Sequence, residues 1–164
     1  NMKRVNLSLP VIALLTLAGC QSAPVVVSEP IKTFSISPEC IEYTLQADNE
    51  MIIGFTPVYF EVNSDKSYSK LDTHMSCVAT YLANNSDKEL NVQGFTDDKG
   101  TVKYNKALAQ RRADGLVEFL ISLGTSNDQL ISTTKVIEDN GVKLTSSERS
   151  KTRRVNFSIT NKSS

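Results

Sequence analysis

Apolar and polar residues follow two different periods along the chain, and their order predicts a sheet covered by helices. Amphipathic helices are expected over 68–84 and about 102–123, because apolar side chains recur there every three or four residues. Runs of strand length, apolar or alternating, stand at 51–53, 58–62, 90–94, 130–137 and 154–159, and a short helix-strand pair is the alternative at 130–137. The order of the stronger elements, β-α-β-α-β-loop-β, predicts an α+β fold with helices packed on one face of the sheet.

Turn-forming residues mark the borders of these elements. Gly54 and Pro57 are expected to separate the first two runs into two short strands. Gly124 is expected to end the second helix, because glycine tolerates the left-handed conformation that closes many helices. A polar loop through Asn140, Gly141 and Ser146 is expected before the last strand.

The charges of the chain balance. Its 164 residues include 18 Lys plus Arg and 18 Asp plus Glu, so the formal net charge is zero. Such a surface does not offer the excess of cations that neutralises phosphates, so nucleic acid is not an expected partner. The length suits one domain with appendages.

The residues with the clearest chemistry lie where the strand over 90–94 gives way to the second helix. The strand ends in Gly94-Phe95-Thr96-Asp97, and binding loops of α/β-type layers usually follow the carboxyl ends of strands. In the helix, Asn105 and Arg112 fall on one face at about 100° per residue. Asp97 and Arg112 together complement the ammonium and carboxylate of a free amino-acid head. Capping of turn amides by Asp97 and an internal salt bridge of Arg112 are the alternative roles.

These residues resemble the signature of OmpA-like peptidoglycan-binding domains, in which a Gly-x-Thr-Asp strand end precedes a Tyr-Asn-x-x-Leu-x-x-x-Arg-Ala helix. The run from Tyr104 to Ala113 matches that helix in residue type and spacing, and the likeness extends over 57–159. The resemblance implies a β-α-β-α-β-β sandwich with a mixed sheet. The chain departs from the family pattern at Phe95, at Thr152 and over 136–140, where the family commonly has His, Asn and Gly-x-Gly-Glu.

The resemblance also implies a ligand and a set of contact residues. In the family, the aspartate and the arginine before the alanine hold the zwitterionic end of diaminopimelate in the peptide stem of peptidoglycan, which corresponds here to Asp97 and Arg112. Asn63, Thr96 and Asn105 are expected to line the same site. We therefore expect Asp97→Ala or Arg112→Ala to abolish wall binding without unfolding the domain.

The first twenty residues have the pattern of a targeting segment. Lys3 and Arg4 precede an apolar run over 11–17 that is too short to span a bilayer. The run from Leu17 to Cys20, Leu-Ala-Gly-Cys, resembles a bacterial lipobox. That resemblance implies a signal peptide over 1–19, acylation of Cys20 and anchoring in the outer membrane with the domain in the periplasm. An ordinary signal peptide is the alternative.

Three segments are expected after the signal peptide. Residues 20–38 contain prolines, serines and valines without a sustained period, which is typical of a flexible tether. Residues 39–56 form an N-terminal extension with weak strand signals, and 57–162 form the OmpA-like domain.

Cys40 and Cys77 remain once Cys20 is set aside. An oxidising periplasm favours a disulfide between them, since only one intramolecular pairing is possible. We expect this bond to pin the segment before the first strand onto the first helix. Two free thiols are the alternative.

The chain is poorly equipped for catalysis. Its one histidine, His74, is expected to be a packing or surface residue of the first helix, and no set of nucleophile, base and orienting group is visible. A Cys77–His74 dyad is the less favoured interpretation. Cys and His residues do not cluster at metal-ligand spacing, so neither a metal nor a cofactor is expected.

The predicted function is that of a non-catalytic lipoprotein that binds diaminopimelate in peptidoglycan and tethers the cell wall to the outer membrane. The alternative is a protein-binding scaffold subunit of an envelope complex, such as a Tol-Pal-like complex, a flagellar ring or a secretion apparatus.

Overall fold

The computed structural model describes residues 36–137, 141 and 143–163. The signal peptide over 1–19, Cys20 and nearly all of the tether over 20–38 lie outside the described residues. In the described part the elements are α1 (Pro38–Ile41), β1 (Thr44–Gln46), β2 (Ile52–Tyr59), α2 (Asp72–Asn84), β3 (Lys88–Phe95), α3 (Val102–Ser122), the 3-10 helix η1 (Asn127–Gln129), β4 (Leu130–Lys135), α4 (Ser146–Thr152) and β5 (Arg154–Asn161).

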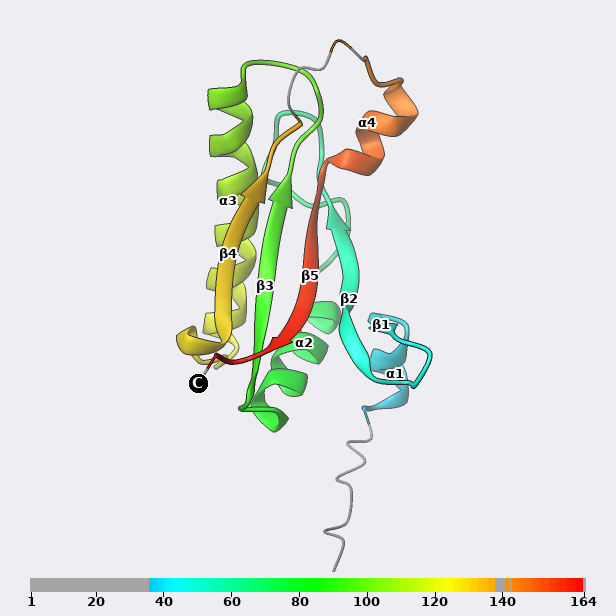
Figure 1. The fold of residues 1–164 in the computed structure, drawn as a ribbon, viewed down its shortest axis with the longest axis vertical. Coiled ribbons are helices and arrows are strands. Elements are labelled where there is room, and N and C mark those ends of the chain that lie inside the picture. The colour runs from blue at the N-terminus through cyan, green and yellow to red at the C-terminus, as the bar shows by residue number, and fades with distance from the viewer. Residues whose placement is uncertain (1–35, 138–140, 142, 164) are drawn as a thin grey trace, which may run out of the picture. The chain divides into compact units, whose positions relative to one another are not determined.

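The strands form one mixed sheet, as predicted. Five strands lie in the order β1-β2-β5-β3-β4 (Figure 1). β3 runs parallel to β4 and antiparallel to β5, and β2 is antiparallel to both β5 and β1. The carboxyl ends of β3 and β4 therefore lie at the same end of the sheet as the start of β5 and the end of β2. The α+β class is confirmed.

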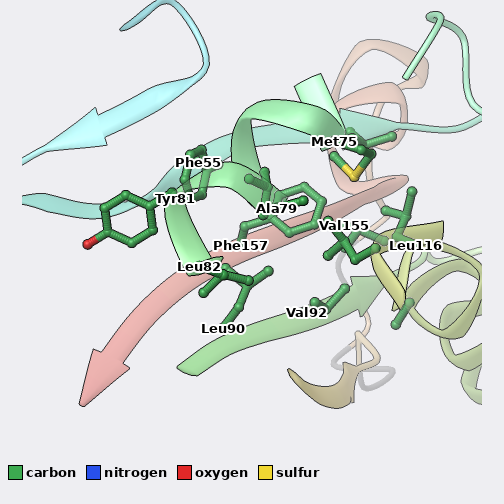
Figure 2. Packing of buried hydrophobic residues seen from close by; sticks show 14 of the residues in the cluster. Phe55, Met75, Ala79, Tyr81, Leu82, Leu90, Val92, Leu116, Val155 and Phe157 are labelled. Carbon is green, nitrogen blue, oxygen red and sulfur yellow. The ribbon is translucent and has the colours of Figure 1, made fainter. Parts of the chain in front are cut away.

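The core lies between the sheet and the two long helices, α2 and α3. Alternate residues of the central strands, such as Leu90 and Val92 in β3 and Val155 and Phe157 in β5, are at most 2% exposed and face the helices (Figure 2). The helices bury Met75, Val78, Leu82, Ala113, Leu116 and Leu120 against them. Each large apolar side chain buried in this way contributes about 1.5–3 kcal/mol relative to an exposed one. The opposite face of the sheet carries mostly polar side chains.

The prediction of two short strands at 51–53 and 58–62 is wrong, because one strand, β2, runs from Ile52 to Tyr59. Pro57 does not break it, since the β2–β5 pairing is irregular between Phe55 and Val58, where a missing amide donor is tolerated. Gly54 allows close approach of the neighbouring strand: a Cβ there would lie 2.2 Å from the Phe157 carbonyl oxygen. The extension over 39–56 thus supplies α1, β1 and much of β2.

Two further elements differ from the sequence-based expectations. The polar loop before the last strand contains α4, which begins with a capping box in which Thr145 and Glu148 satisfy each other's backbone amides. The first long helix begins at Asp72 and not near residue 68. Its predecessor, the segment from Phe60 to Ser67, forms a turn closed by a single β-bridge between those two residues.

Gly94 sets the distance between β3 and α3. A Cβ at this position would lie 2.0 Å from the carbonyl oxygen of Ala109, so a side chain would push the helix away from the strand. Because the helix backbone lies this close to the end of β3, side chains of α3 reach the loop that follows the strand.

The disulfide predicted between Cys40 and Cys77 is confirmed, with a Cα–Cα distance of 5.5 Å, and it joins α1 to α2. One turn before Cys77, the His74 ring stacks on Tyr43 at 4.7 Å between centroids and meets Phe157 edge-on at 5.7 Å. Burial lowers the pKa of His74 to about 4, so the ring is neutral at physiological pH. His74 is therefore a packing residue.

No helix in the described part of the chain is both long and apolar enough to cross a membrane.

Candidate functional site

The residues predicted for the site come together at the end of the sheet where β3 and β4 finish and β5 begins (Figure 1). They line a small depression with an empty volume of about 170 Å³. Its lining residues are Asn63, Thr96, Asp97, Asn105, Leu108, Arg112 and Arg153. All five predicted site residues are among them, and Arg153 is an addition.

Arg112 is only 1% exposed, and its guanidinium is held by backbone carbonyls. Nε donates to Ser64 O at 2.9 Å, Nη1 to Phe95 O at 2.9 Å and Nη2 to Glu61 O at 3.0 Å. The guanidinium also lies 5.1 Å from the centre of the Phe60 ring. Arg112 thus ties the turn after β2 to the end of β3.

Asp97 and Arg112 face the same depression, but they are held by different partners. The Asp97 carboxylate, 8% exposed, accepts from the Lys99 amide at 3.0 Å and from Arg153 Nη1 at 3.3 Å. Its ion pair is therefore with Arg153. Burial lowers the pKa of Arg112 to about 10, while the negative charge of Asp97 acts in the opposite direction. Arg112 is still charged at neutral pH.

Arg153 lines the same depression and was not among the site residues predicted from the sequence. It is 7% exposed, and besides Asp97 it contacts Phe60 O through Nε at 3.2 Å and the Tyr68 hydroxyl through Nη2 at 3.3 Å. It stands between α4 and β5, as the first of two arginines before Val155. Two adjacent arginines directly before the apolar Val155 of the last strand are the sequence signal that points to Arg153.

Asn105 has a positioning role. Its side-chain amide donates to Asp97 O at 3.2 Å and to Lys99 O at 2.9 Å, so it fixes the loop that carries the Asp97 carboxylate. The start of α3 is further fixed by Thr101, whose hydroxyl accepts from the Tyr104 amide.

The other two predicted residues differ in exposure. Thr96 is 2% exposed, and its buried hydroxyl has no hydrogen-bond partner in the described part of the chain. Asn63 is exposed at the rim and adopts a left-handed backbone conformation with φ 51°, which asparagine tolerates better than most residues. Thr96 therefore offers an unused polar group at the site, and Asn63 shapes the turn beside it.

The neighbouring carboxylate, Asp98, points to a different partner. It accepts from Arg149 Nε at 2.6 Å and from the Leu144 amide at 3.0 Å, which anchors α4 to the loop after β3. The hydrogen bond from Arg149 holds the pKa of Asp98 below its usual value. Asp98 thus pairs with Arg149 and is not among the residues that line the depression.

The cluster of Asp97, Arg112 and Arg153 retains unused hydrogen-bonding capacity. A guanidinium has five N–H donors and a carboxylate has about four acceptor sites. Arg112 and Arg153 each use three donors in the contacts above, and Asp97 uses two acceptor sites. The remaining donors suit a carboxylate, and the remaining acceptors suit an ammonium group.

A five-stranded mixed sheet, two helices on one face and an Asp–Arg cluster at the end of β3 define an OmpA-like domain. The sequence model of the OmpA family matches residues 59–155, and the chain belongs to that family.

The curated relatives include several named peptidoglycan-associated lipoprotein. The chain is 37% identical over 73 residues to the one from Buchnera aphidicola, covering 44% of this chain and 42% of that protein. It is 31% identical over 88 residues to the one from Legionella pneumophila, covering 54% of this chain and 47% of that protein. The chain thus matches less than half the length of these relatives.

Several solved structures resemble the fold, among them the following two. The peptidoglycan-associated lipoprotein from Burkholderia pseudomallei matches with a TM-score of 0.58 and 25% identity, over 63% of this chain and 89% of that one. The C-terminal domain of Helicobacter pylori MotB matches with a TM-score of 0.55 and 25% identity, over 67% of this chain and 88% of that one.

Proposed function

We propose that this protein is a non-catalytic lipoprotein of the outer membrane whose domain binds the diaminopimelate of peptidoglycan stem peptides and so tethers the cell wall. The relatives named as peptidoglycan-associated lipoproteins support wall binding in general. The signal peptide over 1–19, the lipid on Cys20 and the tether over 20–38 are part of the proposal.

One observation carries the choice of ligand: Asp97, Arg112 and Arg153 meet in one buried cluster with donors and acceptors to spare. The free end of diaminopimelate bears an ammonium and a carboxylate on the same carbon. Asp97 accepts from the ammonium, and the two guanidinium groups donate to the carboxylate. The cluster contains two cations and one anion. This net positive charge favours a ligand whose carboxylate lies deeper in the depression than its ammonium group.

The expected affinity for a single stem is low. Two or three charge-assisted hydrogen bonds of about 1.5–3 kcal/mol each, less the cost of association, give a dissociation constant of about millimolar or somewhat lower. A lipid anchor confines the domain beside a dense array of stems, which raises their effective concentration. A weak site is therefore sufficient for tethering.

The proposal predicts that Asp97→Asn weakens cosedimentation with purified diaminopimelate-type sacculi by about tenfold or more, because the neutral amide loses the charge-assisted contact to the ammonium. Asp98→Asn is the matched control, since it removes the same charge from the next residue, which pairs with Arg149. Thermal unfolding verifies that both variants are folded. Equal cosedimentation of the two folded variants contradicts the assignment.

The alternative function, a scaffold subunit of an envelope complex, is favoured by a different observation. The segment of α1, β1 and β2, fastened by the Cys40–Cys77 bond, exposes the apolar side chains Ile41, Leu45, Met51 and Ile53. Such a group of apolar residues suits contact with a protein. The likeness to the MotB domain is compatible with this role. The two functions are distinguished by whether sacculi free of other proteins retain the chain.

A further inference from the structure

We propose that a second hollow beside the Asp97–Arg112–Arg153 cluster binds the free α-carboxylate of the glutamyl residue that precedes diaminopimelate in the stem peptide. This inference rests on the proposed function, and it assigns to the same site a second part of the ligand. The hollow has an empty volume of about 1070 Å³ and lies at the carboxyl ends of β3 and β4. It is lined by Phe95, Thr96, Lys135, Val136, Ile137, Thr152 and Arg154.

The described lining of the hollow is positively charged. Its described residues include two cationic side chains, Lys135 and Arg154, and none of them is a carboxylate. Among the described residues, neither cation forms an ion pair with an acidic side chain. An anion in the hollow would therefore gain the attraction of both charges without displacing an internal partner.

The guanidinium of Arg154 is held in position before any ligand arrives. Nε donates to Asn156 Oδ1 at 2.9 Å, and Nη1 donates to Lys151 O at 2.6 Å. The guanidinium also lies over the Phe95 ring, 4.7 Å from its centre. Neither of these contacts neutralises its charge. A donor fixed in this way binds an anion with a small loss of side-chain entropy.

Thr96 connects the hollow to the diaminopimelate site, because it lines both. Its buried hydroxyl has no hydrogen-bond partner among the described residues, which is uncommon for a residue that is only 2% exposed and indicates a group available to a ligand. The two sites are thus adjacent, with Thr96 at their shared border. A single extended peptide reaches both.

The two adjacent arginines, Arg153 and Arg154, belong to different sites. Arg153 precedes β5 and turns toward Asp97, whereas Arg154, the next residue, faces the open side of the sheet with Phe95. The apolar wall of the hollow, Phe95 with Val136 and Ile137, suits the methylene groups of a γ-linked glutamyl residue. The positive charge of the hollow, its apolar lining and its place beside the diaminopimelate site together favour the glutamyl residue of the stem.

The test is a calorimetric titration of the folded protein with three probes: meso-diaminopimelate, the tripeptide L-alanyl-γ-D-glutamyl-diaminopimelate, and the same tripeptide with its glutamyl α-carboxylate amidated. We expect the free tripeptide to bind about three- to tenfold more tightly than its amide, as for a charge-assisted contact at a partly exposed site. In Arg154→Gln this preference is expected to vanish, while the affinity for diaminopimelate stays unchanged.

Two further variants make the result decisive. Lys135→Gln, at an exposed position, is expected to reduce the preference in part, and Arg111→Gln, which removes an exposed charge from α3 outside the hollow, is expected to leave it intact. Equal affinity of wild-type protein for the two tripeptides overturns the inference, as does a preference that persists in both Arg154→Gln and Lys135→Gln. If diaminopimelate binds and amidation has no effect, the inference alone fails. If none of the three probes binds, the proposed function fails with it.

Discussion

Replacement of Arg112 by alanine is expected to lower the free energy of unfolding by about 3–5 kcal/mol and to abolish wall binding at the same time. The side chain is 1% exposed and donates to three backbone carbonyls, of Glu61, Ser64 and Phe95. Alanine would leave these acceptors without their donor beside a cavity, and each unsatisfied buried group costs about 1–3 kcal/mol. Urea unfolding at equilibrium measures the loss.

Arg111→Ala is the matched control, because the preceding residue of the same helix is exposed and its loss is expected to change stability by about 0.5 kcal/mol or less. Arg112→Lys is expected to fall between the two, since an ammonium group keeps the charge but cannot reproduce the planar fork. A folded Arg112→Ala variant with the stability of wild-type protein would show that the three carbonyl contacts contribute little.

The structure therefore changes what an Arg112 variant can demonstrate. The sequence predicts that Arg112→Ala abolishes binding without unfolding the domain, but three hydrogen bonds to backbone carbonyls give this arginine a structural role as well. Loss of binding in Arg112→Ala does not separate the two roles. Asp97 is the more informative position, because Arg153 keeps its contacts to Phe60 and Tyr68, and Lys99 its contact to Asn105, when the carboxylate becomes an amide.

Loss of the Cys40–Cys77 disulfide is expected to lower the free energy of unfolding by about 4 kcal/mol. The bond closes a loop with a sequence separation of 37, and the chain-entropy relation for a loop of that length gives this magnitude. The double variant Cys40→Ser, Cys77→Ser, unfolded in urea beside wild-type protein, measures the effect. Wall binding per folded molecule is expected to be unchanged, because neither cysteine lines the depression around Asp97.

A reducing agent provides the control for this measurement. It is expected to bring wild-type protein close to the stability of the double-serine variant and to leave that variant unaffected. A difference of less than about 1 kcal/mol between oxidised and reduced wild-type protein would contradict the prediction and show that packing of α1 and His74 suffices to hold the extension.

The sequence predicted the elements whose burial pattern is regular. β3, β5 and α3 were recognisable because their apolar residues alternate or recur on one side, and burial follows that pattern in the structure. β2 was divided in two because Gly54 and Pro57 are local breakers, whereas in the sheet one permits close contact with Phe157 and the other lies at an irregular pairing. Tertiary context overrode the local signal at both positions.

The part of the candidate site that lies within one continuous sequence motif was predictable. Asp97, Asn105 and Arg112 lie within one strand-loop-helix unit, so their common position follows from local geometry. Arg153 joins them only through the antiparallel pairing of β5 with β3, and it is 56 residues from Asp97 in sequence. The carbonyl partners of Arg112 in the turn after β2 are 48 and 51 residues away. No local pattern indicates contacts of this kind.

The most direct test of the account compares two kinds of cell wall with the same wild-type protein. In diaminopimelate-type peptidoglycan the free end of the stem carries an ammonium and a carboxylate, whereas in lysine-type peptidoglycan it carries the ammonium alone. The cluster of Asp97, Arg112 and Arg153 has two cations and one anion. In the proposed function, the carboxylate of the ligand is therefore required for binding. We predict cosedimentation with diaminopimelate-type sacculi and at least about tenfold less with lysine-type sacculi. Equal cosedimentation with both would contradict the account.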